Sequence, residues 1–196
     1  MFQKELLKDG DIILFHTGGF SPISFLIRQM SESYWNHTGM IVIEDKVYVI
    51  EAINKVAKTD LDKYLDNKVY DFKVVRLKKE AFKDEEEYNT AIIVAIVRIK
   101  SLIGKRYDYL AMTWLFLMGS IVMLFRKLEK YIKWNPFQQR SDFFCSELIC
   151  SVYYKVSSKF DYLFQGKTRQ ACDTTTPKDI GKSDNVEYIT GNKEKI

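Results

Sequence analysis

The sequence is poor in the residues that mark several specialised classes of protein. Three prolines and nine glycines in 196 residues exclude collagen-like and linker-dominated chains. The three cysteines, Cys145, Cys150 and Cys172, form no Cys-x-x-Cys pair, which argues against a disulfide framework and a cysteine-rich zinc site. With only two histidines, His16 and His37, any mechanism that needs an imidazole must use one of them.

The charge balance also excludes some functions. Thirty basic residues against 26 acidic ones give a net charge of only +4, too even for an obligate nucleic-acid binder. The N-terminal residues carry charges throughout and contain no apolar stretch of signal-peptide length, so we expect no secretion signal. The thiols are then expected to be reduced and the location to be cytoplasmic. A hydrophobic content of 46% in this length predicts a single domain over residues 1–196.

The pattern of apolar residues predicts an α+β fold. β-formers separated by the polar turn Glu44-Asp45-Lys46 predict a hairpin of 38–43 and 47–52. Apolar spacing with acidic residues at the start and basic ones at the end predicts a helix over 84–103, buried on more than one side. Further strands are expected at 11–16 and 73–77, helices at 21–33 and 142–157, the latter capped by Ser141 or Asp142, and a polar tail at 181–196, loose at its extreme end.

An uncharged run of 17 residues, 109–125, precedes a basic stretch, 126–140, that holds five basic residues and one acidic one. The run is compatible with a buried or pocket-lining helix, an interfacial or lipid-contacting segment, or a membrane span. As a helix it would be about 25 Å long, short of the roughly 30 Å hydrocarbon core, so we expect an insertion over 109–140 that folds back beside the active-site cleft. The candidate lipid or membrane contacts are Trp114, Phe116, Lys127, Lys130 and Lys133.

Cys145 is the candidate nucleophile. It lies near the start of the predicted helix 142–157, where backbone N–H groups and the helix dipole favour a thiolate and can stabilise an oxyanion. The alternative is a small buried apolar cysteine, which suits Cys150 and Cys172 better.

His37 and Glu51 are the candidate base and its orienting group. If the hairpin turn centres on Asp45, residue 39 lies opposite residue 51, and His37 and Glu51 are diagonal neighbours on one face. A shift of one residue would separate them onto opposite faces. Their alternatives are a hairpin-end histidine bonded to backbone and a carboxylate that reaches water.

Six short segments in order along the chain resemble the circularly permuted branch of the papain-like NlpC-type amidases, the YiiX-like group. They are Gly10-Asp11-Ile12-Ile13, Trp35-Asn36-His37-Thr38-Gly39, Glu51-Ala52, Gly104-Lys105-Arg106-Tyr107-Asp108, Cys145-Ser146-Glu147-Leu148 and Thr176-Pro177-Lys178-Asp179-Ile180. In unpermuted relatives the cysteine precedes the histidine, and here the order is reversed.

The resemblance implies a papain-like α+β fold, with an antiparallel sheet or barrel packed against helices. It implies Cys145 as nucleophile, His37 as base, Glu51 as orienter, and Tyr107 in the pocket as a possible oxyanion donor. Through distant similarity to lecithin–retinol acyltransferase-like enzymes it raises the prospect of a lipid or acylated substrate.

These observations predict a cysteine-dependent hydrolase or acyltransferase working through a thioacyl-enzyme. Ser146 joins Tyr107 as a candidate substrate or oxyanion contact. The expected substrates are a small peptide, an amino-acid amide or a lipid-derived acyl compound. We expect no metal or organic cofactor, no nucleic-acid partner, and at most peripheral association with a membrane. The alternative is a non-catalytic lipid-binding module on the same fold.

Overall fold

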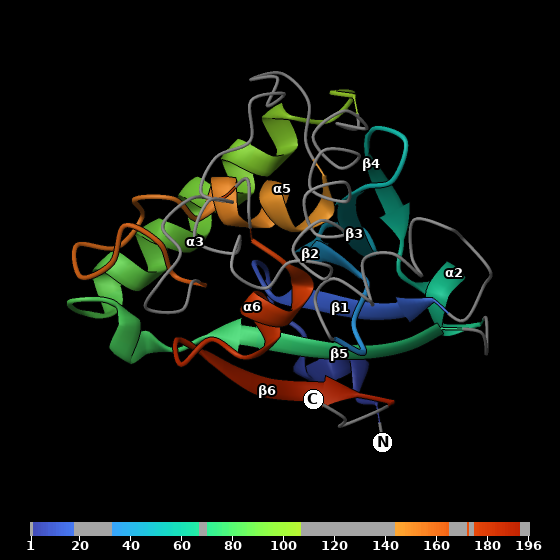
Figure 1. Ribbon diagram of the computed structural model, residues 1–196, viewed down its shortest axis with the longest axis horizontal. Helices are drawn as coiled ribbons and strands as arrows, with labels where there is room; N and C mark the ends of the chain where they lie inside the picture. The colour runs from blue at the N-terminus through green and yellow to red at the C-terminus, as the bar shows by residue number, and fades with distance from the viewer. Residues whose placement is uncertain are drawn as a thin grey trace, which may run out of the picture.

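The computed structural model describes residues 2–17, 33–66, 70–106, 144–164, 172 and 175–192. Within these ranges six strands form one antiparallel sheet in the order β4-β3-β2-β1-β5-β6 (Figure 1). The strands are β1 (Ile12–Thr17), β2 (His37–Ile43), β3 (Val47–Ala52), β4 (Val56–Asp60), β5 (Tyr70–Leu77) and β6 (Val186–Gly191). The helices are α2 (Asp62–Leu65), α3 (Glu85–Ser101), α5 (Cys145–Val152) and α6 (Pro177–Gly181), with short 3-10 turns at Lys4–Leu6 and Lys79–Ala81.

The sheet is apolar on both faces because alternate residues of its central strands enter different cores. Ile12 and Leu14 join the cluster beneath α3, α5 and α6, whereas Ile13 and Phe15 join the cluster that includes residues of α2. This explains the unbroken apolar run of β1, and it confirms the α+β class.

The hairpin of β2 and β3 has the expected register. Gly39 lies opposite Glu51 and Ile43 opposite Val47, so the turn centres on Asp45 as the sequence predicts. Gly39 allows the two strands to pack here, since a Cβ at this position would lie 2.4 Å from Cγ1 of Val49.

Helix α3 is shorter and less buried than expected. The Asp84 side chain accepts a hydrogen bond from the backbone N–H of Glu87 at 2.9 Å and caps the start. The helix ends at Ser101, before Gly104, which has a φ of +92°. The expectation of burial on more than one side is wrong. The buried stripe is Ala91, Ala95 and Ile99, because one face of the helix packs against α5 and the larger core cluster, and Ile93 and Val97 are each 62% exposed.

Two further expectations from the sequence need correction. The helix predicted over 142–157 covers only Cys145–Val152, with Phe144 as its N-cap; after Tyr153 the chain turns, and Lys155 takes a φ of +53°. The segment 181–196, expected as a polar tail, contributes β6, which pairs with β5 at the edge of the sheet. The helix expected at 21–33 lies almost entirely outside the described residues.

Candidate active site

The hairpin brings His37 and Glu51 into direct contact. Nε2 of His37 lies 2.7 Å from Oε2 of Glu51. The Glu51 side chain is fully buried, whereas that of His37 is 16% exposed. A buried carboxylate needs compensating partners, and the imidazole is one of them.

The second oxygen of the Glu51 carboxylate is also occupied. The hydroxyl of Tyr64 donates a hydrogen bond to Oε1, and the side chain of Thr59 is a further hydrogen-bond partner. Burial raises the pKa of Glu51, but the hydrogen bonds and charge of His37, together with Tyr64 and Thr59, outweigh it, so the pKa is lowered overall. Glu51 is therefore ionised at neutral pH.

Cys145 is carried by the first turn of α5, which packs against β2 and β3. It is buried and is the free cysteine of the described residues. As the first helical residue, it lies among backbone N–H groups that have no partner within the helix. The Glu147 carboxylate accepts a hydrogen bond from the Phe144 N–H at 3.4 Å and helps to cap this end.

The Cys145 side chain lies near enough to His37 to act on the pKa of the imidazole. Because Nε2 of the imidazole faces Glu51, Nδ1 is the ring atom left for the sulfur. Burial lowers the pKa of His37, but Cys145 and the carboxylate of Glu51 act in the opposite direction and raise it to about 10. The imidazole thus lies between two groups that favour its protonated form.

Comparison with known proteins identifies the family. A family model described as "permuted papain-like amidase enzyme, YaeF/YiiX, C92 family" matches residues 6–112, which include His37 and Glu51. The chain belongs to this family. Membership makes it a papain-like cysteine hydrolase of the amidase type.

A solved structure supports the same fold. The chain is similar to the crystal structure of the metalloprotein yiiX from Escherichia coli O157:H7, with a TM-score of 0.60 and 18% sequence identity over 94% of this chain and 97% of that one. The search of the curated proteins found no match. Together with the family match, the similarity confirms the permuted papain-like fold expected from the ordered motifs.

No group of three or more His, Cys, Asp or Glu side chains that could hold a metal ion occurs among the described residues.

The other candidate site residues divide into two groups. The Ser146 hydroxyl donates a hydrogen bond to the backbone carbonyl of Thr175 at 2.6 Å, so a contact from this residue to a substrate would have to use its backbone N–H. The remaining candidates lie outside the described residues: Tyr107, Trp114, Phe116, Lys127, Lys130 and Lys133. Within the described ranges, no helix is long and apolar enough to cross a membrane.

The first family motif, Gly10-Asp11, is structural. The buried Asp11 carboxylate accepts hydrogen bonds from Arg76 Nε at 2.7 Å, Arg76 Nη2 at 2.8 Å and the Lys8 N–H at 2.8 Å. Gly10 has a φ of +81°, and its carbonyl accepts a hydrogen bond from the Tyr153 hydroxyl at 2.6 Å. The motif therefore links the start of β1 to β5 and to the end of α5.

Cys150 and Cys172 form a disulfide, with a Cα–Cα distance of 5.3 Å. The expectation of reduced thiols is wrong for this pair, because the fold brings together two cysteines whose spacing of 22 residues gives no signal in the sequence. Disulfides are typical of oxidising compartments, so the cytoplasmic expectation loses the thiol argument on which it partly rested.

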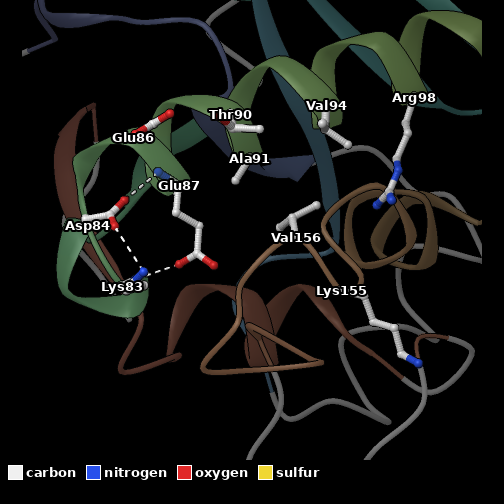
Figure 2. Close-up of a pocket in the computed structure, with 10 residues that line it drawn as sticks. All are labelled: Lys83, Asp84, Glu86, Glu87, Thr90, Ala91, Val94, Arg98, Lys155 and Val156. Carbon is white, nitrogen blue, oxygen red and sulfur yellow. Dashed lines mark hydrogen bonds and ion pairs between the residues drawn. The ribbon is translucent and has the colours of Figure 1, made fainter.

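A pocket of about 500 Å³ lies away from Cys145, between α3 and the segment around Val156. Figure 2 shows Asp84, Glu86 and Glu87 at one end, with Lys83 beside them, and Arg98 and Lys155 at the other end. Its principal charged groups serve the fold: Glu87 accepts the backbone N–H groups of Lys83 and Ser158, and Arg98 donates to the carbonyls of Val152 and Tyr154. This pocket is therefore not the candidate active site.

Proposed function

We propose that Cys145, His37 and Glu51 act as a catalytic triad in the hydrolysis of an amide or ester. The observation that supports this is the place of His37, which lies 2.7 Å from the buried Glu51 carboxylate and has a pKa that Cys145 raises. This is the arrangement of nucleophile, base and orienting group that cysteine hydrolases need. The family match supports a cysteine mechanism independently of these contacts.

The reaction follows from the positions of the three groups. The Cys145 thiolate attacks the carbonyl carbon of the substrate, forming a C–S bond and a tetrahedral intermediate whose oxyanion faces the N–H groups at the start of α5. The C–N or C–O bond then breaks, and the His37 imidazolium gives its proton to the leaving amine or alkoxide. His37 next takes a proton from water, which attacks the thioester and releases the acid and the thiolate.

The first experiment uses iodoacetamide, since the natural substrate is not needed. Cys145 should be alkylated rapidly near neutral pH in the wild-type protein and much more slowly in His37→Ala, whereas His16→Ala should behave as the wild type. Equal rates in the wild type and His37→Ala would contradict the triad. That result would favour the alternative, a non-catalytic lipid-binding module on the same fold.

The substrate class is proposed as a small peptide, an amino-acid amide or a lipid-linked acyl compound. The last option is supported by the uncharged run 109–125 and the net charge of +4 over 126–140, which together suit an acyl chain and an anionic surface. Binding to vesicles containing phosphatidylserine should then weaken with added salt and with Lys127→Gln, Lys130→Gln and Lys133→Gln combined. Equal, salt-independent binding to neutral phosphatidylcholine vesicles would remove the electrostatic part of this proposal.

A further inference from the structure

Both oxygens of the Glu51 carboxylate have a partner, and the triad accounts for only one of these two contacts. Oε2 faces Nε2 of His37 at 2.7 Å, and Oε1 receives the Tyr64 hydroxyl. A carboxylate anchored through one oxygen can still rotate about the bond to its methylene carbon. Anchoring through both oxygens fixes the plane of the carboxylate, and with it the direction in which it accepts the proton of the imidazole.

The Tyr64 ring is itself held firmly. It lies on the short helix α2, is 8% exposed, and packs against Phe15 and Tyr70 with ring centroids 4.7 and 5.2 Å away. Phe15 also stacks on the His37 ring, at 5.9 Å between centroids and an angle of 25° between planes. One phenylalanine thus touches the rings at both ends of the His37–Glu51–Tyr64 chain.

We propose that Tyr64 is a positioning residue of the active site, which holds the Glu51 carboxylate so that His37 donates Nε2–H to it and presents Nδ1 to Cys145. This inference rests on the triad proposed above. Burial and the neighbouring Glu51 carboxylate raise the pKa of Tyr64 well above its ordinary value, so its hydroxyl remains a donor over the whole working range. Tyr64 does not touch the reacting atoms and acts only through Glu51.

The test compares four proteins: the wild type, Tyr64→Phe, Glu51→Gln and the double variant. The readout is the rate of Cys145 alkylation by iodoacetamide at neutral pH, with thermal unfolding measured for each protein. Tyr64→Phe removes one hydrogen bond to a charged group and keeps the ring, so we expect the rate to fall about tenfold. In the Glu51→Gln background the same substitution should produce no further loss, because a residue acting through Glu51 has nothing left to position.

Tyr70→Phe is the matched control. It makes the same chemical change in the adjacent ring, which packs against Tyr64 but has no described bond to Glu51, and it should leave the alkylation rate unchanged. An unchanged rate in Tyr64→Phe, or an equal loss in the presence and absence of Glu51, would overturn the inference and leave Tyr64 a packing residue.

Failure of the triad itself, or failure of Tyr64→Phe to fold, would give results different from those above. If wild-type Cys145 reacts no faster than Cys145 in His37→Ala, the triad itself fails and the role of Tyr64 fails with it. If Tyr64→Phe does not fold, Thr59→Val takes its place, because Thr59 hydrogen-bonds to the same carboxylate. A loss in Thr59→Val that disappears in the Glu51→Gln background would support anchoring of the Glu51 carboxylate by partners other than His37, and a loss that persists there would contradict it.

Discussion

The two sides of the candidate site are built by different means. His37 and Glu51 lie on neighbouring strands of one hairpin, 14 residues apart, and the strand register alone brings them together. Cys145 arrives on α5, more than 90 residues later, and its place depends on tertiary contacts with the sheet and α3 and on the Cys150–Cys172 disulfide. We call His37 and Glu51 the base side and Cys145 the nucleophile side. The geometry of the base side should therefore survive substitutions that displace the nucleophile.

The largest effect should come from removing the groups that react. Cys145→Ala and His37→Ala should each lower turnover of p-nitrophenyl acyl esters or peptide anilides by about 10³-fold or more. The double variant should be little worse than either, because the two groups act as a unit. Additive losses would show that the nucleophile and base sides work independently.

Loss of the disulfide should affect the nucleophile side next. Replacing both Cys150 and Cys172 by alanine should lower the free energy of unfolding by about 3 kcal/mol, as expected for closing a loop of this size, and should slow Cys145 alkylation. Urea unfolding with and without reductant checks this. Reductant should destabilise the wild type and Cys145→Ala but not the double alanine variant, and an unaffected wild type would contradict the disulfide.

Gly39→Ala should damage the base side. The new methyl would lie 2.4 Å from Val49 Cγ1 and 3.1 Å from Glu51 Cβ, so the strands must separate at a cost of about 1–3 kcal/mol. Urea unfolding measures the loss. Combining Gly39→Ala with Val49→Ala should cost less than the sum of the two single changes, since the nearest clash is then removed; strict additivity would exclude this contact as the cause.

The pH dependence of stability tests the charged groups that join the two sides of the site. The pKa of His37 rises from about 6.5 unfolded to about 10 folded, so its contribution is complete below pH 6.5 and is lost as the pH rises through 10. Glu51 has a lowered pKa, so its contribution is present above its ordinary pKa and is lost as the pH falls through the lowered value.

The alkaline loss should disappear in His37→Gln, and it can be followed by unfolding at a series of pH values. Cys145→Ala should also lower the pKa of His37, because it removes one of the groups that raise it. In a His16→Gln background a single imidazole remains to be titrated by NMR. An unchanged titration of His37 on removal of Cys145 would show that the two sides of the site do not interact.

Local features of the site were predictable from the sequence, and distant ones were not. The turn at Glu44-Asp45-Lys46 was sufficient to place Gly39 opposite Glu51. By contrast, β4 and β6 each have a single buried hydrophobic residue, Val56 and Val186, and exist because a neighbouring strand pairs with them. The Cys150–Cys172 pair and the Tyr64–Glu51 bond could not be predicted either, because each joins elements that only the complete fold brings together.

The two ends of the described chain lie close together, so the same fold could be built with its segments in a different order along the chain. The backbone N–H of Gln3 donates to Oγ1 of Thr190 at 2.9 Å, so residues 187 positions apart lie side by side at the edge of the sheet. A short peptide across this edge, together with a break between residues 106 and 144, would yield a chain that reads Cys145 before His37 while keeping every strand neighbour. The same domain can therefore form with the Cys145 segment before or after the His37 segment, because the site depends on which surfaces pack together and not on which segment is synthesised first.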